Sequence, residues 1–247
     1  MKLKVQNVLE RTYSDGHSGA QVWSVTISTP SNSLPSIITG GGDGSIRAWS
    51  LQEPKPIQLP LPLESSKDDN PKIVKMIKDK TYILTNFGNL LVFDNNNKII
   101  LSHTFNVLKN YGVMDSNSEI MVLGSLNGTM IILSLSTLET LYESQLIDGK
   151  IFSISLLEKD KIVVNGINGL LAVFEFNIKQ NLITELTRGL LPESKQRWFA
   201  VARTWQDCII FGDRMGSVHV YKNDLHLLQT FKKLHGRNGV TDIQTFR

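Results

Sequence analysis

The sequence predicts an all-β fold, a β-propeller of about five four-stranded blades with one further strand at each end of the chain. Two observations carry this prediction. One is a strand–turn–strand block that recurs along the chain, and the other is the succession of short alternating or β-branched runs between its copies. The turn glycines of the block are Gly44, Gly88, Gly128, Gly169 and Gly216, and successive ones lie 44, 40, 41 and 47 residues apart. A period of about 40–45 residues is typical of a blade of four strands.

The first copy of the block, residues 39–50, shows why it should form a hairpin. Ile37 and Ile38 precede it with β-branched apolar side chains, which favour a strand. Residues 42–44, Gly-Asp-Gly, tolerate positive φ, and the Asp side chain can bond its own backbone. Residues 45–49 then alternate with the period of a half-buried strand.

The other expected strands follow the same pattern, with Asn, Asp, Gly or Ser in the turns between them. They span residues 21–27, 73–77, 81–85, 99–101, 111–115, 120–124, 129–133, 138–142, 151–157, 161–165, 170–176, 182–186, 198–204, 208–212, 217–221 and 227–231, and the copy of the block at residues 86–93 supplies a further one. The proline-rich residues 51–71 are expected to form an extended connection, because proline cannot donate to a ladder. Residues 1–9 and 239–246 each have the pattern of a single strand without a partner. We therefore expect residues 1–247 to form one β-propeller domain that is a segment of a longer, multi-propeller chain.

Composition narrows the class of protein. Of the 247 residues, 41% are apolar and 20% are charged, as in an ordinary globular domain. No apolar run approaches the ~18 residues of a membrane span, so we expect no membrane insertion. Cys208 is the only cysteine, which excludes an internal disulfide and favours a cytoplasmic location. The net charge of +3 permits an anionic partner without requiring one.

Four polar residues of the first unit, His17, Thr39, Asp43 and Trp49, are expected to form a structural hydrogen-bond network. A His, an Asp and a hydroxyl could also supply a hydrolytic triad. However, the Asp lies in a hairpin turn and no second feature of a nucleophile accompanies it, so the structural interpretation is favoured. We expect no catalytic residue in the chain.

Two groups of basic residues are candidate contacts for tRNA or a protein partner. Lys232, Lys233, His235 and Arg237 cluster before the last run, whereas Arg197, Arg203 and Arg214 are expected near one end of the fifth unit. Such groups bind nucleic acid by neutralising phosphates, which makes the affinity depend on salt. The alternative is a solvated rim with no partner, since no RNA-binding signature with interleaved aromatic residues accompanies them.

Cofactor and metal sites are not indicated. Residues 40–44 are rich in glycine, but a strand rather than a helix follows them, so they should not cradle a phosphate. The histidines lack zinc-ligand spacing. We therefore expect neither a cofactor nor a metal ion.

Residues 16–24 and 38–49 have the pattern of WD repeats in general. More specifically, residues 197–198, 211–218 and 234–241 together resemble the large WD-repeat subunit of the tRNA wobble-nucleotide ribose 2′-O-methyltransferase, of a fungal type. The resemblance extends over most of the chain.

That resemblance implies a scaffold that is not an enzyme. In this family a separate methyltransferase subunit binds the methyl donor, and the WD-repeat subunit holds that partner and positions the tRNA. The resemblance also implies a link to endosomal recycling, so endosomal association is an alternative to a purely cytoplasmic location. The alternative function is a general protein-interaction propeller, in trafficking or signalling, that makes no contact with RNA.

Overall fold

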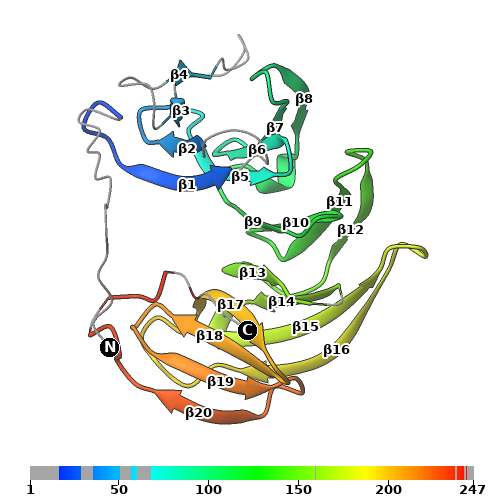
Figure 1. Ribbon diagram of the computed structural model, residues 1–247. Helices are drawn as coiled ribbons and strands as arrows, with labels where there is room; N and C mark the ends of the chain where they lie inside the picture. The colour runs from blue at the N-terminus through cyan, green and yellow to red at the C-terminus, as the bar shows by residue number, and fades with distance from the viewer. Residues whose placement is uncertain are drawn as a thin grey trace, which may run out of the picture. The chain divides into compact units, whose positions relative to one another are not determined.

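The structure is a computed structural model, and it describes residues 17–28, 36–50, 57–59, 68–158, 160–236, 238–241 and 243. The strands form five four-stranded antiparallel sheets, and the strands within each sheet are neighbours in chain order (Figure 1). Across the described residues the only helical segments are two 3-10 turns, η1 (Asn106–Leu108) and η2 (Ile167–Gly169). The predicted all-β fold of five four-stranded units is confirmed.

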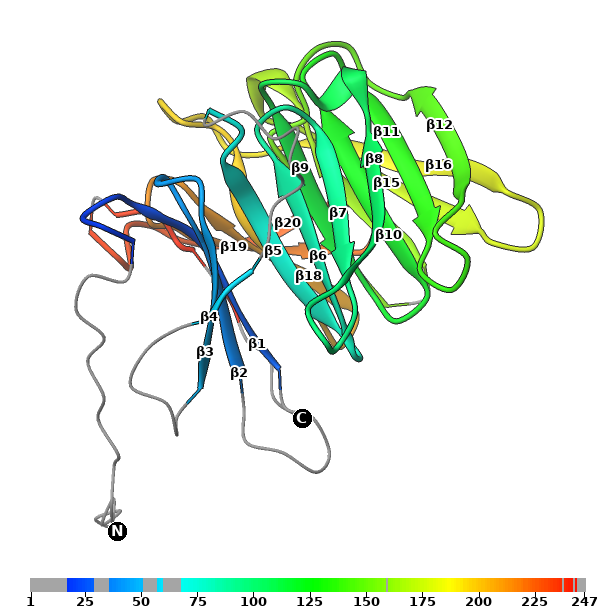
Figure 2. The same ribbon diagram turned by 90° about the horizontal axis from the view of Figure 1, so that it is seen from above.

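The strands lie close to their predicted positions. The first sheet comprises β1 (Val22–Ser28), β2 (Ser36–Gly41), β3 (Ile46–Ser50) and β4 (Ile57–Gln58), and Figure 2 shows β1, β2 and β3 side by side. The second comprises β5 (Pro71–Ile77), β6 (Lys80–Thr85), β7 (Asn89–Phe93) and β8 (Ile99–Thr104). The third comprises β9 (Gly112–Ser116), β10 (Ile120–Ser125), β11 (Thr129–Ser134) and β12 (Thr140–Gln145). The fourth comprises β13 (Ser153–Leu156), β14 (Lys161–Asn165), β15 (Leu170–Asn177) and β16 (Leu182–Leu190). The fifth comprises β17 (Phe199–Trp205), β18 (Cys208–Asp213), β19 (Val218–Lys222) and β20 (Leu227–Phe231).

The chain divides into two compact units, residues 1–104 with the first two sheets and residues 105–247 with the other three. In the first unit, a core that includes Ile38, Ile46 and Ile83 joins the two sheets. In the second unit, one core lies between the third and fourth sheets and includes Val122 and Phe174. A further core joins the fourth and fifth sheets. Because middle strands such as β10 and β11 are buried on both faces, their sequences are nearly continuous apolar runs.

The first strands of neighbouring sheets are joined within each unit by a recurring bond. A polar side chain of one first strand accepts a hydrogen bond from a backbone N–H of the next first strand. The pairs are Ser24 Oγ with Val74 N (3.0 Å), Thr26 Oγ1 with Met76 N (3.2 Å), Asp115 Oδ2 with Leu156 N (2.7 Å) and Ser155 Oγ with Ala202 N (3.2 Å). Each bond satisfies a backbone donor that the antiparallel ladder leaves unpaired.

The five turn glycines have the backbone conformation that the repeat predicts. Their φ values are 76° at Gly44, 80° at Gly88, 88° at Gly128, 77° at Gly169 and 80° at Gly216. These values lie in the left-handed region, which a residue with a Cβ adopts at a cost. A Cβ at Gly128 would also collide with the carbonyl oxygen of Ile147. The five turns thus share a left-handed glycine, although in the fourth sheet the turn is η2 and Asn168 is also left-handed, with φ of 55°.

The ends of the predicted pattern are less regular. Residues 1–9 lie outside the described residues. In the run 239–246, residues 239–241 and 243 are described, and none of them is in a strand. The N–H of Val240 donates to the carbonyl oxygen of Asp213 at 2.9 Å, so this segment lies against the fifth sheet without joining it.

Candidate nucleic-acid interface

The structure brings together the four polar residues singled out in the first sheet. His17 Nδ1 lies 2.8 Å from Asp43 Oδ1, and His17 Nε2 lies 2.8 Å from Thr39 Oγ1. The indole N–H of Trp49 donates to the same Thr39 oxygen at 2.8 Å. A Cβ at Gly41 would collide with the imidazole, so the glycine makes room for it. The hydroxyl is buried and engaged on both sides, an arrangement that serves packing rather than attack on a substrate.

The Asp43 carboxylate is the charged centre of this network. Burial raises its pKa, but hydrogen bonds from His17 and from the backbone and side chain of Ser45 outweigh that effect, and the pKa is about 2. Arg47 Nη2 also donates to Asp43 at 3.0 Å. The carboxylate therefore stays ionised and unavailable as a general acid at neutral pH.

A second buried pair, in the fifth sheet, was missed by sequence reasoning. His219 Nε2 lies 2.9 Å from Asp213 Oδ2, and His219 Nδ1 lies 3.1 Å from Thr230 Oγ1. Asp213 also accepts from the backbone N–H groups of Met215 and Ser217. The sequence does contain a signal for this pair. Asp213 stands three residues before the turn glycine Gly216, where its carboxylate can accept N–H groups of the turn.

Thr85 and Ser125 occupy the same position relative to their own turn glycines. Each side-chain oxygen accepts the N–H of the residue four positions later, Asn89 and Thr129 respectively. These polar groups tie down their own turns, and so they are structural.

Exposed basic side chains gather at the β18–β19 turn of the second unit, and we refer to Arg214, Lys232, Lys233 and His235 as the basic turn. The segment after β20 folds back onto this turn. The N–H of Lys233 donates to Ser217 Oγ at 3.2 Å, and the N–H of His235 donates to the carbonyl oxygen of Gly216 at 3.1 Å. Two basic segments that the sequence separates therefore form one surface.

The other predicted basic residues fall in different places. Arg197 lies at the same end as the basic turn, but its side chain is half-buried across Gly169, and its Nε donates to the carbonyl oxygen of Leu191 at 2.5 Å. The expectation that Arg203 lies near this end is wrong. It pairs with Ile210 toward the far end of β17, four residues beyond Phe199, or about 13 Å along a strand. Arg237 lies outside the described residues.

Three aromatic side chains lie at the same end of the second unit, and we refer to Tyr111, Phe152 and Trp198 as the aromatic steps. The rings of Phe152 and Trp198 are stacked, with centroids 4.8 Å apart and planes 10° from parallel. The Tyr111 hydroxyl donates to the carbonyl oxygen of Phe152 at 3.2 Å. The basic turn adjoins them, since the N–H of Arg214 donates to the carbonyl oxygen of Trp198 at 3.3 Å.

Lys150 adds a positive charge among these rings. Its Nζ lies 3.6 Å from the centroid of Tyr111 and 5.0 Å from that of Phe152, within the range of a cation–π interaction. Burial lowers the pKa of Lys150. Burial also raises the pKa of Tyr111 to about 12, and the charge of Arg214 opposes part of that rise. The site is therefore electropositive and lined by π faces.

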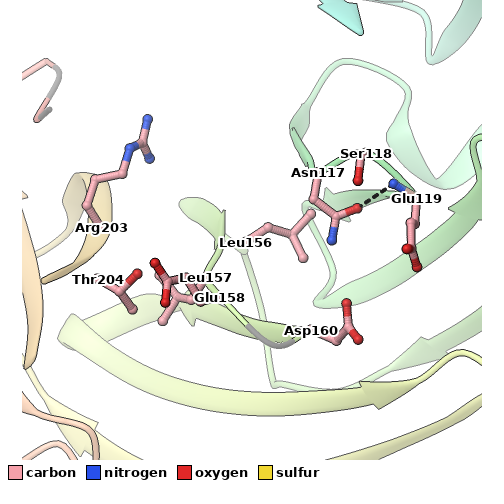
Figure 3. A pocket seen from close by; sticks show the side chains of 9 residues that line it. All are labelled: Asn117, Ser118, Glu119, Leu156, Leu157, Glu158, Asp160, Arg203 and Thr204. Carbon is pink, nitrogen blue, oxygen red and sulfur yellow. Dashed lines mark hydrogen bonds between the residues drawn. The ribbon is translucent and has the colours of Figure 1, made fainter. Parts of the chain in front are cut away.

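The opposite end of the second unit is acidic. An open pocket of about 570 Å³ is lined by Asn117, Ser118, Glu119, Leu156, Leu157, Glu158, Asp160, Arg203 and Thr204 (Figure 3). Arg203 lies across the pocket from Asn117 and Glu119, and the N–H of Glu119 donates to Asn117 Oδ1 at 2.8 Å. Across the ranges that the structure describes, no group of three or more His, Cys, Asp or Glu side chains could hold a metal ion.

No protein-family model and no curated protein match this chain. Solved structures are similar to it in fold. The computationally designed protein Ika8 has a TM-score of 0.67 and 14% identity, over 90% of this chain and 65% of that chain. BamB from Moraxella catarrhalis has a TM-score of 0.61 and 12% identity, over 93% of this chain and 79% of its own. The designed protein Ika4 has a TM-score of 0.53 and 11% identity, over 72% of this chain and 100% of its own.

At such low identities these structures define the class of fold alone. BamB is a β-propeller, and this chain has a propeller-like fold made of five four-stranded sheets. In the described part of the chain, no helix is long and apolar enough to span a membrane. Activity and partners must be argued from the surface, because a shared propeller architecture does not specify them.

Proposed function

We propose that this protein is a non-catalytic scaffold that positions tRNA for a partner methyltransferase, which methylates the ribose 2′-hydroxyl of the wobble nucleotide. The observation that carries the proposal is the basic turn beside the aromatic steps at one end of the second unit. Exposed cations beside π faces suit RNA, which offers phosphates to the cations and bases to the rings.

The buried polar networks support a scaffold rather than an enzyme. The His17–Asp43 and His219–Asp213 pairs are each engaged by side-chain and backbone partners inside their own sheets. A general base needs a lone pair that faces a substrate, and these imidazoles are 3% exposed. The methyl donor and the chemistry are accordingly assigned to the partner subunit, in the cytoplasm, and an endosomal association belongs to the same proposal.

Salt-dependent tRNA binding tests the proposal. A plot of log affinity against log salt concentration has a negative slope. The Lys232→Ala, Lys233→Ala double variant should reduce the magnitude of that slope by about 1.5, since each phosphate contact contributes roughly 0.7–0.9 to it. The matched control is Lys179→Ala, Lys222→Ala, which removes two exposed lysines of the same unit, one in the β15–β16 turn and one at the end of β19. An unchanged slope in the first variant would exclude the basic turn as a tRNA contact. Loss of wobble-ribose methylation in cells that lack the protein, with its return on re-expression, tests the methyltransferase partnership.

The second candidate function is a protein-interaction propeller without RNA contact, and the acidic pocket at the opposite end favours it. Three carboxylates, Glu119, Glu158 and Asp160, line that pocket. Full wobble methylation in cells without the protein, together with no tRNA binding at low salt, would favour this second function.

A further inference from the structure

We infer that the aromatic steps bind the bases of an unpaired strand of nucleic acid, while the basic turn binds its phosphates. This inference rests on the proposed function and names the form of RNA that the surface recognises: single-stranded nucleotides rather than a duplex.

The first argument is the repeated position of the rings. Each aromatic step is the residue immediately before the first strand of its sheet: Tyr111 precedes β9, Phe152 precedes β13 and Trp198 precedes β17. Those three strands lie side by side within the second unit (Figure 1). The repeat therefore places one ring per sheet at the same end, which produces a row of aromatic rings.

The second argument is the partial exposure of the rings. All three are half-buried, whereas the core aromatics Phe199, Phe211 and Tyr221 are 0–1% exposed. A ring that serves only packing gains most by complete burial. Phe152 and Trp198 cover one face of each other and Lys150 lies over Tyr111, so a nucleotide base would stack on the exposed remainder of these rings, beside the cations.

The third argument is the charge of Lys150. Its ammonium is packed among Tyr111 and Phe152, and none of the described carboxylates forms an ion pair with it. A partly desolvated cation without a counter-charge attracts a phosphate oxygen more strongly than a solvated lysine does. Lys150 is thus placed to hold the backbone of a strand whose bases lie on the rings.

Base pairing determines whether a nucleic acid can stack its bases on the aromatic steps. In a duplex each base is covered on both faces by its neighbours, so only phosphates and groove edges are accessible. In an unpaired strand the faces are free to stack on aromatic side chains. A surface that used cations alone would bind both forms, but the rings give the single strand an additional interaction.

Fluorescence anisotropy with three labelled probes tests the inference on the full chain. The probes are a short single-stranded RNA of mixed sequence, the blunt duplex of that sequence, and an abasic strand of equal length that keeps the phosphates. We expect the single strand to bind roughly 5- to 150-fold more tightly than the abasic strand, the effect of stacking one base. Trp198→Leu should remove most of that preference, and Trp198→Phe should restore it, since phenylalanine keeps a ring.

Trp205→Leu is the matched control. Trp205 ends the same strand that Trp198 precedes, and it is 46% exposed at the far end of β17. Its replacement should leave all three affinities unchanged. The Trp198 comparison is made only if the variant unfolds at the wild-type temperature; the three probes with the wild-type protein test the inference in any case.

The outcomes separate this inference from the proposed function. Equal affinity for all three probes, with a salt slope that depends on Lys232 and Lys233, would overturn base stacking and leave the tRNA scaffold standing. Equal affinity for the single strand and the abasic strand would show that the phosphates account for the binding, and would also overturn base stacking. No binding of any probe at low salt would contradict both the inference and the proposed function.

Discussion

The first and fifth sheets each bury a His–Asp pair, yet they assemble it from different positions of the repeat. In the first sheet, His17 precedes β1 and Asp43 lies in the β2–β3 turn, whereas in the fifth, Asp213 ends β18 and His219 lies within β19. In both sheets the carboxylate accepts the N–H that follows the turn glycine, from Ser45 or from Ser217. The comparison teaches that a carboxylate paired with a buried imidazole can hold this turn from different positions of the repeat, whereas the second and third sheets use the hydroxyls of Thr85 and Ser125 instead.

The two pairs differ in exposure. The side chain of Asp43 is 15% exposed and that of Asp213 is 7% exposed. Asp43 also forms an ion pair with Arg47, whereas Asp213 accepts hydrogen bonds from two backbone amides and from His219. The pair in the fifth sheet should therefore contribute more to stability.

Asp213→Ala should have the largest effect. It removes the acceptor of two amides and leaves a buried imidazole without its carboxylate, so the free energy of unfolding should fall by about 3 kcal/mol. Denaturant unfolding followed by tryptophan fluorescence measures the change. Asp207→Ala, in an exposed turn of the same sheet, is the control and should shift stability by under ~0.5 kcal/mol. Equal stability of the two variants would show that the fifth sheet does not depend on the pair.

Asp43→Ala should cost less, about 1–2 kcal/mol, because water can reach the groups that lose their acceptor. The same unfolding measurement applies, with Asp79→Ala in an exposed turn of the first unit as the control. A loss larger than that of Asp213→Ala would reverse the comparison between the two sheets.

Acid should weaken both pairs. Burial raises the pKa of Asp213, but hydrogen bonds from His219, Ser217 and Met215 bring the net pKa below its usual value, and the pKa of Asp43 is about 2. A lowered pKa means that the ionised form stabilises the folded chain above the usual value near 3.8, and that this stability is lost as the pH falls toward about 2. Unfolding measured between about pH 5 and pH 2 should show a shallower loss in Asp43→Asn than in wild type. Parallel curves would contradict an ionised Asp43 network.

Thr230→Val should have the smallest effect, a loss of about 0.5–1 kcal/mol, because it removes only the bond of 3.1 Å to His219 Nδ1. Thr184→Val, at an exposed position of β16, provides the isosteric control. If Thr230→Val approached the effect of Asp213→Ala, the threonine and not the carboxylate would be the main partner of the imidazole.

Most of the fold could be predicted from the sequence because short segments within each repeat determine the strands and the turns. Turn glycines and β-branched runs act over a few residues, so the five sheets and the φ values of Gly44 or Gly216 follow from short segments. The connection 51–71 is expected to pair little, and within its described residues, 57–59 and 68–71, the structure has β4, of two residues, and the start of β5 at Pro71.

The candidate site was harder to predict because it depends on contacts across sheets. Phe152 and Trp198 are 46 residues apart, and a tyrosine, a phenylalanine and a tryptophan at equivalent positions share no local motif. Arg203 was misplaced because closeness in sequence to Arg197 does not put two residues at one end of a strand. Counting residues along the predicted strand places Arg197 before its start and Arg203 toward its other end.

The bonds that run from one first strand to the next have a consequence for how the second unit melts. If the third sheet detached, the N–H of Leu156 would lose Asp115, and detachment of the fourth would deprive Ala202 of Ser155. A backbone N–H that loses its acceptor destabilises the sheet that stays folded, so partial opening is disfavoured at each junction between sheets. Residues 105–247 should accordingly unfold in one cooperative transition, and a fragment that starts at β13 should be less stable than its own sheets would suggest.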